Sequence, residues 1–402
     1  MVPAATRRPT VSEVTVPLTV PLTVPPTSAR RTLYVAFELG VTQWKLALTP
    51  SAGQPPRLRT LPARDMGVVR DEFTRAKAHF GLSGDAPVMS CYEAGRDGFW
   101  LHRALTVAGI VNVVVDSASI EVDRRRRRVK TDRLDAMMLV RMLGRYVEGE
   151  RQVWSVLHVP SAQDEDRRAL HRELAVTTRE RTRLRNRIRG LLISQGIVVT
   201  TWRDFPAQLA EWRTGDGAPL GPVLKMRLQE EWAALEAVEA RHDRLDGLRT
   251  TCLRAADGAD DPRMAQVRQL LALRAIGIET AWVYVMEFFG WRQFTNGRQV
   301  GAAAGLAPTP YASSTLVREQ GISKAGNRRI RALAVESAWL WLRYQPQSAL
   351  SQWYRRRFAT GGPRMRRIGI VALARKLLVA LWHYLEHGIV PSGATFKEAM
   401  AA

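Results

Sequence analysis

Cysteine is scarce in this sequence, with only Cys91 and Cys252 among 402 residues. Two cysteines are too few for a disulfide framework or a cysteine-based zinc site. Long apolar stretches are also missing, since no run reaches the ~20 residues that cross a membrane. The N-terminus lacks the apolar core of a secretion signal. These absences favour a cytoplasmic protein and give no indication of a membrane partner.

Acidic residues are also few in comparison with basic residues. Asp and Glu number 38 against 60 Lys and Arg, which gives a formal net charge of +22. An excess of this size favours binding to a polyanion such as nucleic acid. The alternative is a bias toward arginine codons that has no bearing on binding. The chain is long enough for two or three domains, each with its own core.

The most informative local pattern is a basic run, residues 124–130, that leads into two aspartates, Asp132 and Asp135. The apolar residues that follow favour a helix, which places the two carboxylates on one face, roughly 5–6 Å apart at Cβ. Neighbouring carboxylates repel each other unless a cation lies between them. We therefore interpret them as ligands of a divalent metal, with the arginines holding a polyanion nearby. The alternative is a solvated helix start with acids at its positive end.

Strand-like and helix-like segments alternate upstream of this run, which favours an α/β layer with parallel strands. The predicted strands are 33–37, 44–48, 87–92 and 111–115, and the predicted helices are 64–80 and 97–108. Glu38 and Glu93 follow two of the strands, where α/β sheets place their sites. The arrangement resembles the ribonuclease-H-like fold, whose acids bind two metal ions about 3.5–4 Å apart and cleave phosphodiesters. We interpret Lys45 as charge at a strand edge.

The segments on either side of this layer have different patterns. Residues 1–30 repeat Pro-Leu-Thr-Val and favour a loose tail, because frequent prolines disrupt helices and sheets. Residues 161–250 predict two long amphipathic helices, with apolar residues every three or four positions, as in an antiparallel hairpin or coiled coil. This arm would join two subunits, and its arginines at 179–189 would touch nucleic acid. The alternative is a solvated helical linker.

The C-terminal region begins after Asp260-Asp261-Pro262, a turn-like boundary. Residues 270–281 have the pattern of a helix, a glycine turn and a second helix, which can offer backbone N–H groups to phosphates. A loop with two serines, Ser313 and Ser314, precedes a basic, glycine-punctuated stretch at 318–331. By themselves the serines would be ordinary polar loop residues. Residues 330–343 and 368–387 predict packed helices.

Three motifs together resemble the bridge-RNA-guided DEDD serine transposases of the insertion-sequence-110 family. They are Lys130-Thr-Asp-Arg-Leu-Asp-Ala136, Tyr311-Ala-Ser-Ser314 and Gly321-Ile-Ser-Lys-Ala-Gly-Asn-Arg-Arg-Ile-Arg331. They follow the order of the family, and the resemblance covers about residues 32–390. It implies a RuvC-like N-terminal domain, a coiled-coil arm and a mainly helical C-terminal transposase domain. It also implies a homo-oligomer, a dimer or a tetramer, that binds donor DNA, target DNA and a structured guide RNA.

The resemblance also implies a role for individual residues. Glu38, Glu93, Asp132 and Asp135 would hold Mg²⁺ or Mn²⁺, and Ser313 would be the nucleophile. The family usually carries aspartate at the position of Glu38 and glycine at that of Ser314, which leaves Ser314 as an alternative nucleophile. The side chains expected to contact nucleic acid are Arg124, Arg125, Arg126, Arg127, Arg128, Lys130, Arg133, Arg183, Arg187, Lys324, Asn327, Arg328, Arg329 and Arg331.

We therefore expect five segments: a tail at 1–30, the RuvC-like catalytic domain at 31–150, the arm at 151–262, the transposase domain at 263–392 and a tail at 393–402. The expected function is site-specific, RNA-guided recombination of DNA by an insertion-sequence transposase through a serine–DNA bond. Two alternatives stay open. One is a metal-dependent nuclease of the Holliday-junction type, which does not need Ser313. The other is a nucleic-acid-binding protein without catalysis, in which Glu38 marks a decayed site.

Overall fold

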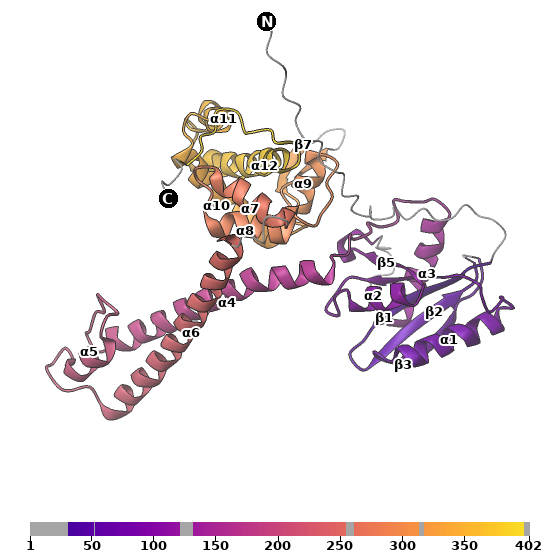
Figure 1. The fold of residues 1–402 in the computed structure, drawn as a ribbon, viewed down its shortest axis with the longest axis horizontal. Coiled ribbons are helices and arrows are strands. Elements are labelled where there is room, and N and C mark those ends of the chain that lie inside the picture. The colour runs from indigo at the N-terminus through magenta and orange to yellow at the C-terminus, as the bar shows by residue number, and fades with distance from the viewer. Residues whose placement is uncertain (1–30, 52, 121–131, 255–260, 313–316, 398–402) are drawn as a thin grey trace, which may run out of the picture. The chain divides into compact units, whose positions relative to one another are not determined.

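The computed structural model of the chain describes residues 31–51, 53–120, 132–254, 261–312 and 317–397. The chain divides into two compact units, residues 1–159 and 160–402. Each unit has hydrophobic clusters of its own, so each is described by itself (Figure 1).

The first unit is built on a mixed five-stranded sheet in the order β3-β2-β1-β4-β5. Its strands are β1 Leu33–Leu39, β2 Gln43–Thr49, β3 Arg57–Pro62, β4 Val88–Glu93 and β5 Val111–Val115. β1, β4 and β5 are parallel, whereas β2 is antiparallel to both β1 and β3. The expectation of a parallel layer is therefore wrong for one half of the sheet. The connections after β1 and β2 are short, and short turns join antiparallel neighbours.

Helices cover both faces of this sheet (Figure 1). Helices α1, Met66–His79, and α2, Trp100–Val107, pack on the face that carries Leu33 and Phe37. Helix α3, Asp132–Val147, packs on the opposite face against Ala36 and Cys91. Successive residues of β1 enter different cores because strand side chains alternate. A short 3₁₀ helix, Ser117–Ser119, follows β5. The mixed sheet with its helices is consistent with the ribonuclease-H-like fold predicted from the sequence.

The second unit begins with a long helical hairpin, as the spacing of apolar residues predicted. Helix α4, Ala162–Ile193, and helix α6, Pro222–Arg254, pack along each other, and the short helix α5, Phe205–Glu211, lies at the tip (Figure 1). Arg185 and Arg187 of α4 pair with Glu239 and Glu231 of α6. The later arginine pairs with the earlier glutamate, so the two helices are antiparallel. An apolar cluster around Phe205 closes the tip.

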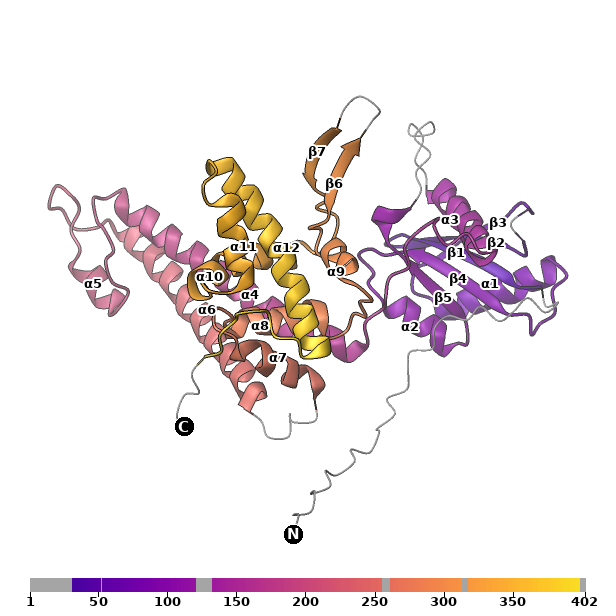
Figure 2. The ribbon, with the colours of Figure 1, turned by 90° about the horizontal axis from the view of Figure 1, so that it is seen from above.

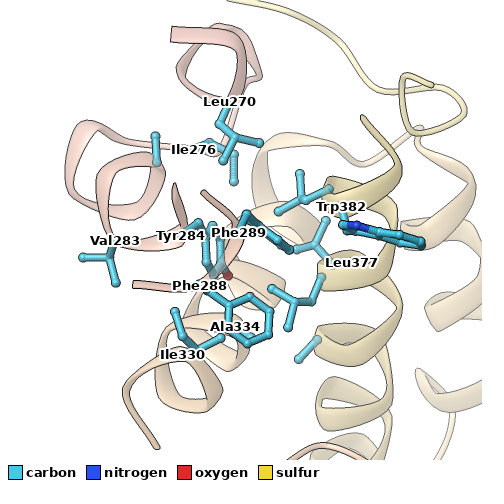
Figure 3. Packing of buried hydrophobic residues seen from close by; sticks show 14 of the residues in the cluster. Leu270, Ile276, Val283, Tyr284, Phe288, Phe289, Ile330, Ala334, Leu377 and Trp382 are labelled. Atoms are coloured by element: carbon cyan, nitrogen blue, oxygen red, sulfur yellow. The ribbon is translucent and has the colours of Figure 1, made fainter. Parts of the chain in front are cut away.

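The rest of the second unit is mainly helical. Its elements are α7 Pro262–Ala272, α8 Ile278–Tyr284, a π-helical turn η4 Val285–Phe289, α9 Gly297–Ala303, α10 Arg328–Tyr344, α11 Ala349–Phe358 and α12 Pro363–His387. Aromatic residues of α8 and η4 form the centre of the core, where Tyr284, Phe288 and Phe289 meet Ile330 and Leu377 (Figure 3). The expected glycine turn separates α7 from α8, and the expected packed helices correspond to α10 and α12.

Helix α12 has a composition that the sequence analysis did not anticipate. By length and composition alone it could cross a membrane, and half of its most apolar window is buried inside the unit. Leu373, Leu377 and Leu381 belong to the core, and the helix packs against α10 and α11. Its apolar character is therefore accounted for by its place as a core helix.

Strands β6, Pro308–Ala312, and β7, Val317–Ile322, form an antiparallel hairpin (Figure 2). The sequence suggested a loop around Ser313 and Ser314, and the two strands were not predicted. The register pairs Ala312 with Val317. Residues 313–316, which lie outside the described residues, therefore connect the two strands.

Candidate active site

Glu38 and Glu93 are neighbours at one end of the sheet. The parallel strands β1 and β4 pair Phe37 with Tyr92, so the next residues along both strands are the two glutamates. Side chains alternate along a strand. The residues two positions before each glutamate are buried in the core beneath α3. Both glutamates therefore lie on the face of the sheet that α3 covers.

Helix α3 brings two more carboxylates to this end of the sheet. The residues one helical turn after Asp132 and Asp135 belong to the buried stripe of α3, so both aspartates continue the side of the helix that faces the sheet. Asp132 Oδ2 lies 3.3 Å from Lys45 Nζ. Lys45 is the register partner of Glu38 across β1 and β2. Asp132 is thus placed at the edge that carries Glu38.

Lys45 is more than charge at a strand edge, and that interpretation is wrong. β2 lies between β1 and β3, so Lys45 is on an interior strand. β3 was not predicted, because its residues 57–60 are exposed or half-buried and include two arginines. The Lys45 ammonium instead places a positive charge among the predicted metal ligands.

The donor set at this edge fits a hard divalent cation, because Mg²⁺ and Mn²⁺ prefer carboxylate oxygens. Among the described residues, no three His, Cys, Asp or Glu side chains lie close enough together to hold an ion. The four acids nevertheless share one edge and one face, so side-chain rotation could bring them around a cation. Lys45 would then have to release Asp132.

Both candidate nucleophiles, Ser313 and Ser314, lie outside the described residues, but the strands that bracket them are defined. Thr309 Oγ1 donates a hydrogen bond to a backbone carbonyl of β7 at 3.3 Å. Below the hairpin, the backbone N–H of Ser323 donates to Ala307 O at 2.8 Å. Hydrogen bonds between the two strands therefore hold the base of the serine-bearing hairpin together.

The glycine-punctuated motif at 321–331 fastens this hairpin to α9. Lys324 N donates to Gly305 O at 3.1 Å, and Asn327 N donates to Ala303 O at 2.8 Å. Gly326 has a φ of +132°, and a Cβ at this position would lie 2.5 Å from Ala303 O. Only glycine accommodates both the backbone angle and the close approach.

Comparison with known proteins identifies the family. A model described as "Transposase IS116/IS110/IS902 family" matches residues 267–374, which include the β6–β7 hairpin. The protein y4rJ of Sinorhizobium fredii (strain NBRC 101917 / NGR234), named as a candidate transposase, is 42% identical over 388 residues, which are 92% of this chain and 97% of y4rJ. The chain belongs to the IS116/IS110/IS902 transposase family. The transposase for insertion sequence element IS1328 of Yersinia enterocolitica is 27% identical over 243 residues, 58% of this chain and 68% of its own length.

Several side chains of the transposase that were predicted to contact nucleic acid have partners within the protein. Asn327 Oδ1 caps α10 by accepting hydrogen bonds from the backbone N–H groups of Arg329 and Ile330, at 3.0 and 3.1 Å. Arg331 Nη1 donates to the carbonyls of Ala304 and Lys324. The side chains of Lys324 and Arg328 are exposed, whereas Arg329 is half-buried. Exposed cations of this motif are the ones able to reach a phosphate.

The other predicted cations differ in their surroundings. Residues 124–130 lie outside the described residues. Arg133 and Arg183 are exposed. Arg187 Nη1 donates to both carboxylate oxygens of Glu231, at 2.6 and 2.9 Å, and so helps to hold α4 against α6. At least part of the arginine content of the arm therefore stabilises the hairpin itself.

The transposase also has a buried carboxylate, Glu287 of η4, that the sequence analysis did not single out. Glu287 accepts hydrogen bonds from His171 Nε2 at 3.0 Å, from Arg172 Nη2 at 2.7 Å and from Asn327 Nδ2 at 3.2 Å. Burial raises the pKa of this carboxyl, but the hydrogen bonds from His171 and Arg172 outweigh burial and hold the pKa at about 2. Its partners are up to 116 positions away, so no local pattern could reveal it.

Proposed function

We propose that this transposase cuts and rejoins DNA through a covalent bond between Ser313 and a DNA phosphate. Glu38, Glu93, Asp132 and Asp135 would hold Mg²⁺ or Mn²⁺ for this reaction. The observation that carries the proposal is the placement of two strand-end acids and two helix acids at one edge and on one face of the sheet. The family match supports DNA of an insertion sequence as the substrate.

The proposed serine step preserves the energy of a phosphodiester bond. Ser313 Oγ attacks a backbone phosphorus, a new O–P bond forms, and one P–O bond of the strand breaks. The serine proton passes to a base, and the departing DNA oxygen takes up a proton. A hydroxyl of another strand then attacks the same phosphorus and releases the serine, so no nucleotide cofactor is consumed. Divalent ions, when bound, would stabilise the negative charge on the phosphate oxygens.

We further propose that the transposase acts as a homo-oligomer with a structured guide RNA, at the nucleoid in the bacterial cytoplasm. The three family motifs support this proposal, as does the net charge of +22, which suits two kinds of nucleic acid. Sequencing the RNA that copurifies with the protein would test it. A single structured species encoded beside the gene is the expected result, and a random sample of cellular RNA would contradict it.

A suicide DNA substrate tests the serine step, since it traps the covalent protein–DNA adduct. Ser313→Ala should abolish the adduct, while the matched neighbour variant Ser314→Ala should keep most of it. Asp135→Asn should lose the adduct although Ser313 is intact. Peptide mass spectrometry then locates the link. A link at Ser314 would move the assignment by one residue, and a link at a tyrosine would overturn the serine mechanism.

One observation favours a second candidate, a metal-dependent junction nuclease. The four acids lie in the first compact unit, whereas the hairpin with the serines belongs to the second. Hydrolysis of DNA by a carboxylate-bound metal needs no serine. Full cleavage of branched DNA by Ser313→Ala, without any adduct in the wild-type protein, would support the nuclease over the recombinase.

A further inference from the structure

A wide groove of about 1360 Å³ lies beside the serine-bearing hairpin in the second unit. One wall is the side of α12 that faces away from the core, and the start of α9 and the base of β6 and β7 border it (Figure 2). Pro308, Thr309, Gly321 and Ile322 contribute the hairpin side. The groove therefore leads toward the strands that are joined by residues 313–316.

The charge of the groove has one sign. Among the described residues, its lining contains five cationic side chains and no Asp or Glu. These are Arg298, Arg364, Arg367, Arg375 and Lys376. Arg364 and Arg367 are exposed on the first turns of α12, where the backbone N–H groups add positive charge. A ligand that enters this groove is therefore expected to be anionic.

The floor of the groove is apolar. Trp353 of α11 and Ile368, Val371 and Val379 of α12 line it, and Ile368 is 47% exposed. The Lys376 ammonium lies over the Trp353 ring, 4.9 Å from its centre, so a cation and an aromatic side chain stand at the same place in the groove. The ligand therefore needs apolar surface beside its charges.

A ligand of this groove needs both negative charge and apolar surface. Two candidate occupants offer only one of the two. A second copy of the chain carries the same net charge of +22, so it would be repelled from five cations. A DNA or RNA duplex presents phosphates, but its bases are stacked inside and have no faces to offer to an apolar floor. An unpaired strand meets both conditions, because its phosphates match the cations and its bases expose flat, weakly polar faces.

We propose that this groove binds unpaired nucleotides, with the phosphates on Arg364 and Arg367 and the bases against Trp353 and Ile368. The site would hold a single-stranded segment of nucleic acid beside the hairpin. This binding does not depend on the identity of the nucleophile, so it stands or falls independently of the serine step.

The full-length protein, a fluorescein-labelled oligothymidylate and a duplex of equal length provide the test, with fluorescence anisotropy as the measurement. The double variant Arg364→Ala/Arg367→Ala should bind the single strand about 10-fold more weakly than wild type. It should also lower the slope of log affinity against log salt by about 1.4, at ~0.7 for each lost contact on a single strand. The loss on the duplex should be smaller.

The matched control is Arg356→Ala/Arg357→Ala, which removes two exposed arginines of α11 that do not line the groove. It should bind the single strand within about 2-fold of wild type. Equal losses in the two double variants would overturn the proposal, as would equal losses on single strand and duplex. Thermal unfolding of each variant shows whether it is folded, because all four positions are exposed.

An abasic strand tests the apolar floor, since it keeps the phosphates and lacks the bases. Wild type should bind it at least about 5-fold more weakly than the oligothymidylate, because contact between a base and an aromatic side chain contributes that much or more. Equal affinities for the two strands would mean that the cations bind phosphate alone, and the groove would not be a nucleotide site.

Discussion

Glu287 connects three elements of the second unit: the arm helix α4, the π-helical turn η4 and the start of α10. It does so through hydrogen bonds from His171, Arg172 and Asn327. Burial, above all, lowers the pKa of His171, whose Nε2 lies 3.0 Å from the Glu287 carboxylate. A single carboxylate therefore links the geometry of the arm to the foot of the serine-bearing hairpin.

Replacing Glu287 with Gln should lower the free energy of unfolding by roughly 1.5–3 kcal/mol, the usual contribution of hydrogen bonds to a charged group. The amide keeps the shape but can no longer accept from every donor. Urea unfolding of the full chain measures the loss. Glu279→Gln makes the same chemical change at an exposed position of α8, and should alter stability by less than about 0.5 kcal/mol. Equal losses in the two variants would contradict the prediction.

Acid should weaken the stabilisation of the fold by the Glu287 carboxylate. The pKa of Glu287 lies at about 2, below its usual value of 4.5, so the unfolded chain takes up this proton more readily than the folded one. The carboxylate therefore stabilises the fold fully above about pH 5, and the stabilisation is lost as the pH falls through 2. The difference in stability between wild type and Glu287→Gln should be constant from pH 8 to 5 and shrink below pH 4.5. A constant difference down to pH 3 would contradict the assignment.

If Asp132 binds a metal ion as proposed, Lys45 would compete with that ion, because its ammonium lies 3.3 Å from Asp132 Oδ2. Lys45→Ala should lower the Mg²⁺ concentration that gives half-maximal adduct formation by up to about 5-fold, since an exposed ion pair contributes ~0.2–1 kcal/mol. Lys77→Ala, on α1 of the opposite face, is the control. A higher Mg²⁺ requirement in Lys45→Ala would show that Lys45 supports the site instead.

The elements of the fold could be predicted wherever a long apolar pattern marks them. Apolar runs predicted β1, β2, β4 and β5, and the spacing of apolar residues predicted the two helices of the arm. The same runs located Glu38 and Glu93 at strand ends. β3 was missed because its residues are mostly solvent-facing, and the β6–β7 hairpin because proline and glycine interrupt it. The partners of Lys45 and Glu287 were missed because only the tertiary fold brings them together.

The caps of α9 and α10 give a prediction at the scale of the element. Asn296 and Asn327 cap these helices with the same pair of side-chain hydrogen bonds. Only Asn327 also donates to Glu287. Asn296→Ala should cost about 1 kcal/mol, as for an ordinary cap. Asn327→Ala should cost roughly 2–3 kcal/mol, because a buried carboxylate loses a donor as well. Thermal or urea unfolding compares them, and equal costs would exclude a role for the link to Glu287.

At the scale of the whole molecule, cationic side chains are spread over both units, whereas the predicted metal ligands belong to the first unit. Glu38 and Glu93 lie side by side at one end of the sheet in the first unit, and Asp132 pairs there with Lys45. Cationic side chains occur in the run before α3, in the arm and along α12, and over the whole chain 60 Lys and Arg against 38 Asp and Glu give the net charge of +22. Composition was enough to predict a nucleic-acid partner. The groove beside α12 could not be predicted, because its lining comes from five elements, α9, β6, β7, α11 and α12, whose contacts only the fold creates.

A pair of triple variants separates net charge from local charge. Arg125, Arg126 and Arg127 changed to Ala, and Arg355, Arg356 and Arg357 changed to Ala, each reduce the net charge from +22 to +19. If residues 124–128 contact phosphates, the first variant should lower the salt slope of duplex binding by about 2.7, at ~0.9 for each contact. The second should leave the slope nearly unchanged. Anisotropy titrations across a range of salt concentrations measure both slopes. The same slope in the two variants would mean that only total charge matters and that the run before Asp132 makes no specific phosphate contacts.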